Sequence, residues 1–438
     1  MTSGINTREM IMEILLQIDE EGEHSHIAIR NALSKYQFLP KQERSFITRV
    51  CEGTLEYRIY IDYVIDSFSK VSVNKMKPQI REILRSAVYQ LKFMDSVPDS
   101  AVCNEAVKLA VKKNFGTLRG FVNGVLRNIA RNIDNIEYPD KSTNTDKYLS
   151  VKYSVPEELA GYFLEKFGDN ETEEMFEAFN KDKSTYIRCN TKKTDIAGLT
   201  AALEAEGVTV TNEGIDKRID YALKISGYDY LGGLKSFRDG LFFVQDISSM
   251  LASQGGFIKR DAYVIDVCAA PGGKSINAAL MADIGHVSSR DISGRKVSLI
   301  KENAERLGID NITYKVWDAV KKDEESVEKA DVLICDLPCS GLGIMGRKND
   351  IKYRVTEEQI ESLVELQHTI LQNACRYVKA GGTLLYSTCT ITKEENTLQV
   401  ERFLKEHPEY TLKEQRQFLQ GIDACDGFYY AVLHKLGD

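Results

Sequence analysis

Residues 263–274 read Tyr-Val-Ile-Asp-Val-Cys-Ala-Ala-Pro-Gly-Gly-Lys. Apart from one aspartate, the first five residues are aromatic or β-branched, which is typical of a buried strand. Most of the following residues are small, so backbone N–H groups in this loop can approach a ligand closely. A strand that leads into such a loop is typical of α/β proteins, which bind nucleotide-like cofactors at the carboxyl ends of their strands.

The chain after this loop alternates between strand and helix patterns. Apolar and β-branched residues predict further strands over 287–292, 312–317, 332–335 and 383–386. Helical periodicity falls between them, most clearly over 356–378. Near-continuous apolar strands indicate a parallel sheet with helices on both faces. Residues 241–438 are therefore predicted to form a Rossmann-like α/β domain with a mostly parallel sheet.

The first third of the chain shows only helical patterns, so residues 1–138 are predicted to form an all-α bundle. One example is the i, i+3, i+4, i+7 series of Ile11, Ile14, Leu15 and Ile18. The polar stretch 139–149 carries no apolar period and is the predicted domain boundary. Residues 150–240 mix strand and helix signals and predict a small α+β, RRM-like module. The fold class is thus multidomain.

Charge is distributed unevenly along the chain. The 57 Lys and Arg residues and 65 Asp and Glu residues give a formal net charge of −8. The segment from Val71 to Arg131, however, contains eleven basic residues and only four acidic ones. Such a segment is typical of proteins that contact a phosphate backbone, although solvated helix faces would produce the same pattern.

The sequence shows no signal for a membrane, a secretory route or a metal. It has no 18-residue apolar run, and Met1–Met10 lacks the basic and apolar regions of a signal peptide. Its nine cysteines include no Cys-x-x-Cys pair. Reduced thiols and a cytoplasmic location are therefore expected, and no metal site.

Three aspartates stand at or just after predicted strands, namely Asp291, Asp318 and Asp336. In a parallel sheet these positions share one edge. Asp291 lies 19 residues after Gly272, close to the spacing at which an acidic residue reaches ribose hydroxyls. Asp318 is a candidate for binding an adenine amino group. A single aspartate of this kind is often only a cap, but three together indicate a nucleoside site.

Residues 268–275 also come close to a phosphate-binding loop. They read Cys-Ala-Ala-Pro-Gly-Gly-Lys-Ser, whereas that pattern begins with glycine. A side chain at Cys268 would obstruct the wrap around phosphates, and acidic strand ends repel a triphosphate without magnesium. A nucleotidase is therefore the less favoured alternative.

Two cysteines follow predicted strands and are nucleophile candidates. They are Cys339, in a Pro-Cys-Ser-Gly turn, and Cys389, in a Ser-Thr-Cys-Thr stretch. A thiol needs a positive neighbour or a helix N-terminus for activation. The hydroxyl and acidic residues after Cys389 predict that it lies at the start of a helix. The other cysteines predicted to be buried and inert are Cys51, Cys103, Cys189, Cys335, Cys375 and Cys425.

The combination of motifs over residues 245–438 resembles the RNA cytosine-5 methyltransferase family. The likeness is carried by Asp-x-Cys-Ala-Ala-Pro-Gly-Gly-Lys at 266–274, Asp-Leu-Pro-Cys-Ser-Gly-Leu-Gly at 336–343 and Tyr-Ser-Thr-Cys-Thr at 386–390. Residues 104–107 and 120–127 resemble NusB-type RNA-binding proteins. The domain order is similar to that of Sun/Fmu-type methyltransferases of 16S ribosomal RNA. Arg290 departs from the family, which usually has a small or apolar residue there.

The resemblance implies methylation of cytosine C5 with S-adenosyl-L-methionine, which leaves S-adenosyl-L-homocysteine. Cys389 would be the nucleophile that adds to cytosine C6, Cys339 would assist product release, and Asp336 would stabilise the adduct. The cofactor-binding residues would be Cys268, Ala269, Ala270, Pro271, Gly272, Gly273, Lys274, Asp291, Asp318 and Asp336.

Three rival interpretations remain open at this point. DNA cytosine-5 methyltransferases use the Pro-Cys thiol, which would make Cys339 the nucleophile. The substrate could be a transfer RNA, or the chain could bind RNA without catalysis. The expected partner is 16S ribosomal RNA. No DNA or membrane partner is expected, and the protein is expected to be a monomer.

Overall fold

The structure is a computed structural model that describes residues 6–36, 38–181 and 184–437. The chain divides into two compact units, which are described separately. The first contains residues 1–180 and the short segment 347–354, and the second contains 181–346 and 355–438. The predicted division at 138, 150 and 240 stays a prediction. None of the described helices is long and apolar enough to cross a membrane.

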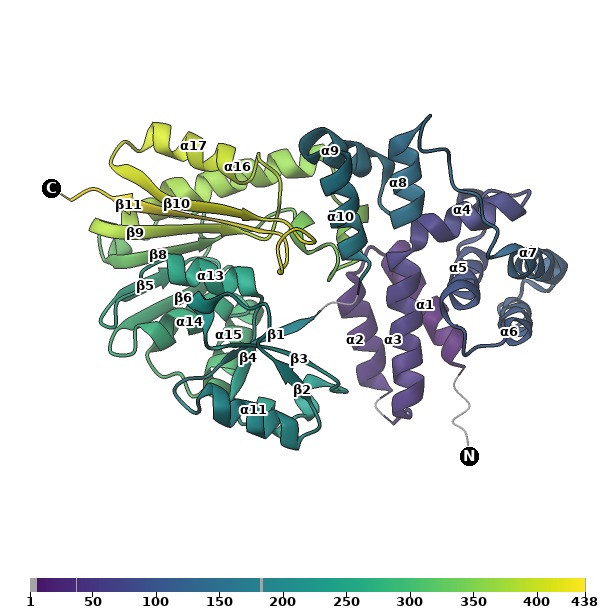
Figure 1. Cartoon of the computed structure of the whole chain (residues 1–438), viewed down its shortest axis with the longest axis horizontal. Coiled ribbons are helices and arrows are strands. Elements are labelled where there is room, and N and C mark those ends of the chain that lie inside the picture. The colour runs from purple at the N-terminus through teal and green to yellow at the C-terminus, as the bar shows by residue number, and fades with distance from the viewer. Residues whose placement is uncertain (1–5, 37, 182–183, 438) are drawn as a thin grey trace. The chain divides into compact units, whose positions relative to one another are not determined.

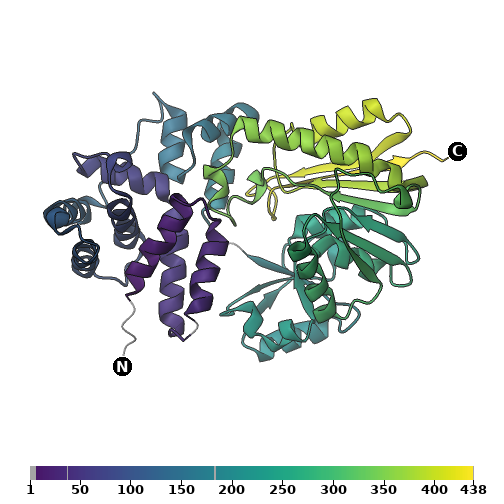
Figure 2. The ribbon, with the colours of Figure 1, turned by 180° about the vertical axis from the view of Figure 1, so that it is seen from behind.

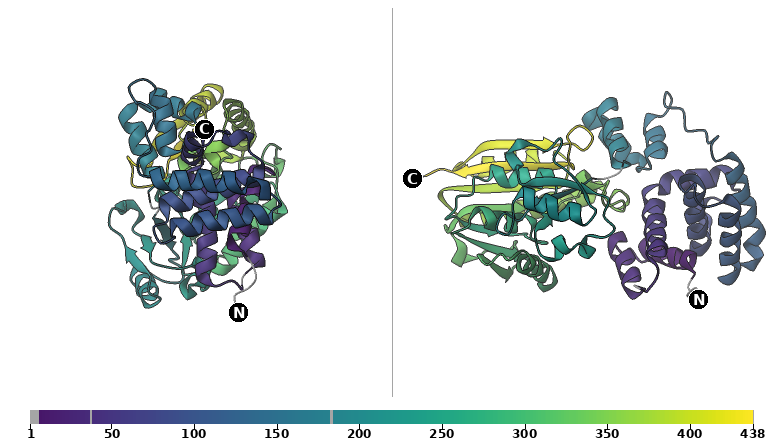
Figure 3. Two further views of the ribbon diagram at one scale, coloured as in Figure 1. Left: turned by 90° about the vertical axis from the view of Figure 1, so that its right-hand side faces the viewer. Right: turned by 60° about the horizontal axis from the view of Figure 1, so that its bottom comes forward.

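The first unit is helical (Figure 1). Its α-helices are α1 (Thr7–Asp19), α2 (Ser25–Lys35), α3 (Lys41–Glu56), α4 (Arg58–Phe68), α5 (Pro78–Phe93), α6 (Asp99–Lys112), α7 (Arg119–Asn132), α8 (Thr145–Tyr153), α9 (Glu157–Phe167) and α10 (Asp169–Phe179). The predicted series on α1 is buried, and the Asn6 side chain caps this helix by accepting from the backbone N–H groups of Arg8 and Glu9. Helices α6 and α7 lie side by side (Figure 3). Helix α8 begins within the polar stretch 139–149, so that stretch is not entirely irregular.

A buried ion cluster lies inside this helical unit. Arg85 donates to both carboxylate oxygens of Asp62 at 2.8 and 2.7 Å, and to Glu82 at 2.8 Å. Arg81 donates to Asp19 at 2.7 Å. These two arginines belong to the basic segment that was predicted to contact phosphate, but their guanidinium groups are paired with carboxylates of the protein. By contrast, Arg119, Arg127 and Arg131 of α7 are exposed.

The segment 347–354 belongs to the first unit and packs against its helices. The Asp350 carboxylate accepts from the backbone N–H and the hydroxyl of Ser25 at 3.3 and 2.8 Å, at the start of α2. Lys352 and Tyr353 donate to the carbonyls of Glu56 and Leu55. Both contacts are at the end of α3, so this segment is held at the ends of two helices.

The second unit begins with a four-stranded antiparallel sheet. Its elements are β1 (Thr185–Cys189), α11 (Ile196–Ala205), β2 (Thr209–Thr211), β3 (Ala222–Ser226), α12 (Lys235–Arg238) and β4 (Phe242–Val244), with strand order β2-β3-β1-β4. Strands β1 to β3 lie within residues 150–240, where the sequence showed strand and helix signals. Strand β4 lies just beyond this range and was not predicted, because three residues give too short a pattern.

The large sheet of this unit has seven strands in the order β10-β11-β9-β8-β5-β6-β7. They are β5 (Tyr263–Asp266), β6 (His286–Asp291), β7 (Ile312–Val316), β8 (Ala330–Asp336), β9 (Val378–Thr388), β10 (Tyr410–Phe418) and β11 (Phe428–Lys435). Strands β5 to β9 are parallel, which confirms the predicted mostly parallel sheet. Strand β11 pairs antiparallel with both β9 and β10. Neither β10 nor β11 was predicted.

Helices cover both faces of the large sheet (Figures 1 and 2). On one face lie α13 (Ile247–Gly255), α14 (Gly273–Met281) and α15 (Gly294–Leu307). On the other lie α16 (Glu357–Ala374) and α17 (Thr397–Glu406). Neighbouring residues of a strand face opposite cores: Val264 packs in the first, and Ile265 in the second. The parallel strands thereby bury both faces and leave only their ends for a site.

Candidate functional site

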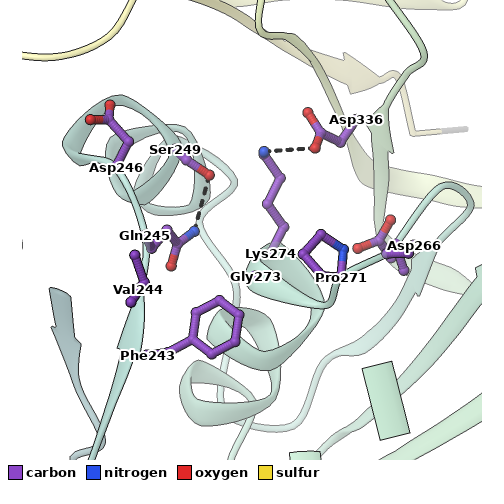
Figure 4. Close-up of a pocket in the computed structure, with 12 residues that line it drawn as sticks. Phe243, Val244, Gln245, Asp246, Ser249, Asp266, Pro271, Gly273, Lys274 and Asp336 are labelled. Atoms are coloured by element: carbon purple, nitrogen blue, oxygen red, sulfur yellow. Dashed lines mark hydrogen bonds and ion pairs between the residues drawn. The ribbon is translucent and has the colours of Figure 1, made fainter. Parts of the chain in front are cut away.

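A cavity of about 210 Å³ opens at the carboxyl ends of β5 and β8 (Figure 4). It is lined by Phe243, Val244, Gln245, Asp246, Ser249, Asp266, Ala269, Ala270, Pro271, Gly273, Lys274 and Asp336. Ligand sites in parallel sheets occur at this end of the strands. The volume is below the roughly 300–1,000 Å³ of sites for drug-sized ligands, so it suits a single base or part of a nucleoside.

The small-residue loop forms one wall of the cavity. Strand β5 ends at Asp266 and α14 begins at Gly273. Gly272 has a φ of 109°, a backbone conformation that favours glycine. A Cβ at this residue would also lie 3.1 Å from the Cδ1 atom of Ile276. The loop can therefore turn into the helix only with glycine at this position.

The cavity holds an ion pair between the loop and β8. Lys274 Nζ lies 2.8 Å from Asp336 Oδ2, and both side chains point into the cavity (Figure 4). The Ser387 hydroxyl on β9 donates to Asp336 Oδ1 at 2.7 Å. Lys274 Nζ also lies 4.8 Å from the centroid of the Phe428 ring. These contacts fix Asp336 while leaving its carboxylate on the cavity wall.

A second carboxylate on the wall is protonated more readily than usual. Burial, together with the nearby Asp336 charge, raises the pKa of Asp266 to about 7, although the Ser275 hydroxyl and the Lys274 charge act to lower it. Ser275 donates to Asp266 Oδ2 at 2.7 Å. At neutral pH the Asp266 carboxyl is therefore partly neutral, which limits the negative charge buried beside Asp336.

The two predicted nucleophiles lie together. The sulfurs of Cys339 and Cys389 are 3.2 Å apart, and both side chains are half-buried. Cys339 follows β8, which ends at Asp336, and Cys389 follows β9, which ends at Thr388. Since β8 and β9 are parallel neighbours, their ends meet. The thiol pair thus lies next to the strand ends that carry Asp336 and Ser387.

The loops that carry the thiols are closed by a backbone contact with a third loop. The N–H of Gly343 donates to the carbonyl of Cys389 at 3.1 Å, and the N–H of Gly427 donates to the carbonyl of Gly343 at 2.9 Å. A Cβ at Gly343 would lie 2.0 Å from the carbonyl oxygen of Gly427. Glycine is required there because the two backbones touch.

The predicted helix start at Cys389 is wrong. Helix α17 begins at Thr397, eight residues further along. The hydroxyl and acidic residues in between form a buried turn, in which the Thr392 hydroxyl donates to the Glu395 carboxylate at 2.8 Å. A helix dipole therefore does not activate this sulfur. The pKa of the Cys339 thiol is raised well above its ordinary value by the adjacent Cys389 sulfur, by burial, and by the charges of Glu395 and Asp336.

The remaining cofactor candidates lie around the cavity without lining it. The Asp291 carboxylate, at the end of β6, accepts from the backbone N–H of Ala270 at 3.0 Å. Asp318 follows β7 and accepts from the N–H of Val320 at 3.2 Å. Cys268 is half-buried, and burial raises the pKa of its thiol. These residues and Gly272 share the sheet edge with the cavity, and their contacts to a cofactor stay predictions.

Sequence reasoning assigned no role to the stretch 243–249, which forms the wall opposite the loop. The Gln245 amide donates to the Ser249 hydroxyl at 3.0 Å (Figure 4). It also accepts from Arg188. Arg188 also donates to the carbonyl of Gly273 at 2.9 Å. The small antiparallel sheet is thereby tied to the start of α14. The only signal in the sequence was that the family likeness begins at residue 245.

Arg290, the departure from the family, is buried in a cluster of its own. Its guanidinium donates to Asp323 at 2.9 Å and to Ser326 at 2.7 Å. Lys315 also donates to Asp323, at 2.8 Å. Although burial opposes it, hydrogen bonds from Lys315 and Ser326 and the charge of Arg290 lower the pKa of Asp323. This cluster anchors the 323–326 segment to β6.

We expect Asp323→Ala to destabilise the second unit by about 3–5 kcal/mol, because it leaves the Arg290 charge buried without its partner. Urea unfolding can be followed by the fluorescence of Trp317, the single tryptophan of the sequence. The double variant Arg290→Met/Asp323→Leu is the control and should lose less. A loss below about 1 kcal/mol in the single variant would contradict this account of the cluster.

Two family models match the chain, one on each part. The model described as the NusB family matches residues 5–131, and the model described as 16S rRNA methyltransferase RsmB/F matches residues 258–434. The predicted NusB-like helical bundle is thereby confirmed. With the Rossmann-like sheet, these matches define the class of the protein: an RNA methyltransferase.

Similar proteins cover almost the whole chain. A probable ribosomal RNA small subunit methyltransferase B of Bacillus subtilis (strain 168) is 34% identical, over 99% of this chain and 99% of its own. The corresponding protein of Synechocystis sp. is 32% identical, over 93% of this chain and 90% of its own. The chain belongs to the ribosomal RNA small subunit methyltransferase B family.

Solved structures share the fold. The crystal structure of PH0851 covers 99% of this chain and 100% of its own, with a TM-score of 0.81 and 28% identity. The structure of NSun6 from Pyrococcus horikoshii with SFG covers 65% of this chain and 99% of its own, with a TM-score of 0.59 and 22% identity. The second likeness concerns the fold alone.

Proposed function

We propose that this protein methylates C5 of a cytosine in 16S ribosomal RNA, with S-adenosyl-L-methionine as the methyl donor and a covalent adduct between Cys389 and cytosine C6. The observation that carries the proposal is the 3.2 Å separation of the Cys339 and Cys389 sulfurs beside Asp336, which lines the cavity. The names of the relatives support the ribosomal RNA substrate.

Cytosine C5 is a poor nucleophile and does not take up a methyl group unaided. The reaction therefore needs a second nucleophile that activates the ring. Addition of the Cys389 thiolate to C6 would make C5 enamine-like and able to take up a methyl group. Asp336, held by Lys274 and Ser387, would hydrogen-bond the ring as charge develops on it. The donor would leave as S-adenosyl-L-homocysteine. Transfer of the C5 proton to a water molecule and elimination of the Cys389 thiolate from C6 would then release the product, with Cys339 assisting.

The loop after β5 fits a nucleoside-type cofactor. Ala269, Ala270 and Gly273 line the cavity, and none of them has a side chain larger than a methyl group. We propose that this loop, Asp291 and Asp318 hold S-adenosyl-L-methionine, whose sulfonium supplies the methyl group. The acidic strand ends favour such a positive ligand over a triphosphate.

The experiment that tests the function is methyl transfer to defined RNA. The purified chain would be given tritiated S-adenosyl-L-methionine and either 16S ribosomal RNA or transfer RNA, both from a strain that lacks the gene. Bisulfite sequencing then locates any 5-methylcytosine. We expect label in one cytosine of the 16S RNA. Label in transfer RNA alone would favour the alternative substrate, and no label in either would favour a binding protein.

We also propose that the helical unit contacts the RNA backbone through the exposed arginines of α7. Replacing Arg127 and Arg131 by alanine should remove up to two phosphate contacts and lower the salt dependence of binding, as the slope of log K against log[KCl], by about 1–2. Anisotropy titrations with labelled 16S RNA measure this slope. The variant with lysine at both positions keeps the charges and should keep the slope. An unchanged slope in the alanine variant would place the RNA elsewhere.

A further inference from the structure

A buried carboxylate lies beside the Cys339 loop, and the reaction described above assigns it no role. Glu395 is fully buried. Its Oε1 accepts from the backbone N–H of Ser340 at 2.8 Å and from the Gln367 amide at 3.0 Å. Its Oε2 accepts from the hydroxyls of Ser340 at 2.5 Å and Thr392 at 2.8 Å. Four donors thus converge on two oxygens, an arrangement that suits an ionised carboxylate, which only accepts.

The same network fixes the backbone on both sides of Cys339. The Gln367 amide donates to the carbonyl of Pro338 at 2.9 Å, and Glu395 holds the N–H of Ser340. The Ser340 hydroxyl also lies 2.7 Å from that of Thr390, the residue after Cys389. Since Ser340 donates to Glu395, it accepts from Thr390. The network therefore joins the loops of the two thiols and sets their spacing.

The charges around Cys339 are mostly negative. The groups that raise the pKa of its thiol are Cys389 from the end of β9, Glu395 from the turn before α17 and Asp336 from the end of β8, and the thiol also interacts with Tyr386 of β9. The Asp336 carboxylate is paired with the ammonium of Lys274 at 2.8 Å. Negative charge around a thiol favours its protonated form.

We propose that Glu395 is a positioning residue that holds the Cys339 loop and keeps the proton on Cys339, so that Cys389 is the sulfur that carries the thiolate. The inference rests on the proposed function, because it states why one of two adjacent thiols is the nucleophile. The Cys339 S–H can then donate to the Cys389 sulfur, and this hydrogen bond stabilises the Cys389 thiolate.

The direct test measures the proton on each sulfur. The full chain would be alkylated briefly with iodoacetamide between pH 6 and 10, and mass spectrometry would give the initial rate at each cysteine. In the unmodified protein we expect Cys389 to react at least about tenfold faster than Cys339 at pH 8. In Glu395→Gln the shape is kept but the charge is lost, so the Cys339 rate at pH 8 should rise about tenfold, the effect of one pKa unit.

Two control variants separate charge from shape. Glu395→Asp keeps the charge on a shorter side chain, and Glu394→Gln removes the charge of the neighbouring carboxylate. Both should leave the rate of Cys339 alkylation at each pH within about twofold of that in the unmodified protein.

For methylation, Glu395→Gln should lower kcat about tenfold or more, with the KM for S-adenosyl-L-methionine unchanged, because the thiols are less well placed.

The proposal is overturned if Glu395→Gln leaves the alkylation profile of Cys339 unchanged, or if all three variants shift it alike. Circular dichroism shows whether Glu395→Gln folds. If it does not, the alkylation rates of the two thiols in the unmodified protein test the proposal, and equal rates would overturn it. Methylation by a Cys389→Ala variant would instead refute the proposed nucleophile, whatever the alkylation shows.

Discussion

Cys389→Ala is expected to show no methyl transfer above background, a loss on the order of 10⁴- to 10⁶-fold, as when the nucleophile of a covalent mechanism is removed. Without the sulfur, cytosine C6 has no partner and C5 stays unreactive. The measurement is incorporation of tritium from labelled S-adenosyl-L-methionine into 16S ribosomal RNA at enzyme concentrations above that of the RNA, which detects even a single turnover.

The control for this variant is Cys375→Ala, which deletes a buried sulfur of the same unit outside the site. It should keep its activity. Binding of the methyl donor, measured by calorimetry, should be similar in Cys389→Ala and the unmodified protein, since Cys389 does not line the cavity. Full turnover by Cys389→Ala together with inactive Cys339→Ala would assign the nucleophile to the Pro-Cys thiol, as in DNA cytosine-5 methyltransferases.

Cys339→Ala has the second large effect, of a different kind. Here the nucleophile is present but the group that assists its release is missing, so the enzyme should methylate once and stay bonded to the RNA. We expect a protein–RNA band that survives boiling in SDS and contains most of the enzyme when RNA is in excess. In the unmodified protein this band should be faint, because elimination follows methylation.

Two comparisons make this result specific. The double variant Cys339→Ala/Cys389→Ala should give no band, because the bond is formed by Cys389. Digestion with ribonuclease should leave a nucleotide on the peptide that contains residue 389, which mass spectrometry can identify. Rapid turnover by Cys339→Ala with no band would show that Cys339 has no part in release.

The sequence predicted the parts of the site that lie at strand ends. Parallel strands have continuous apolar patterns, and their carboxyl ends must share an edge. For that reason the sequence alone predicts that Asp336, Cys339 and Cys389 lie near one another. The 3.2 Å contact of the sulfurs depends on loops that no period describes, and on backbone contacts such as that of Gly343 with Gly427.

The misses also have physical reasons. Strand β10 carries charged and polar residues at most positions, which is typical of an edge strand and hides its pattern. The turn after Cys389 resembles a helix start because buried hydroxyl and carboxylate groups satisfy one another there. Arg81 and Arg85 look like solvent-facing basic residues, since only tertiary structure brings Asp19 and Asp62 to them.

The pairing of β9 with β11 has a consequence for synthesis of the protein. Strand β9, which leads to Cys389, has β11 as one of its two neighbours, and β11 lies forty residues further along the chain. A nascent chain that has emerged only as far as Cys389 therefore presents β9 as a bare edge, open to association with other chains. The β10–β11 hairpin must therefore emerge from the ribosome before β9 gains its second neighbour in the sheet.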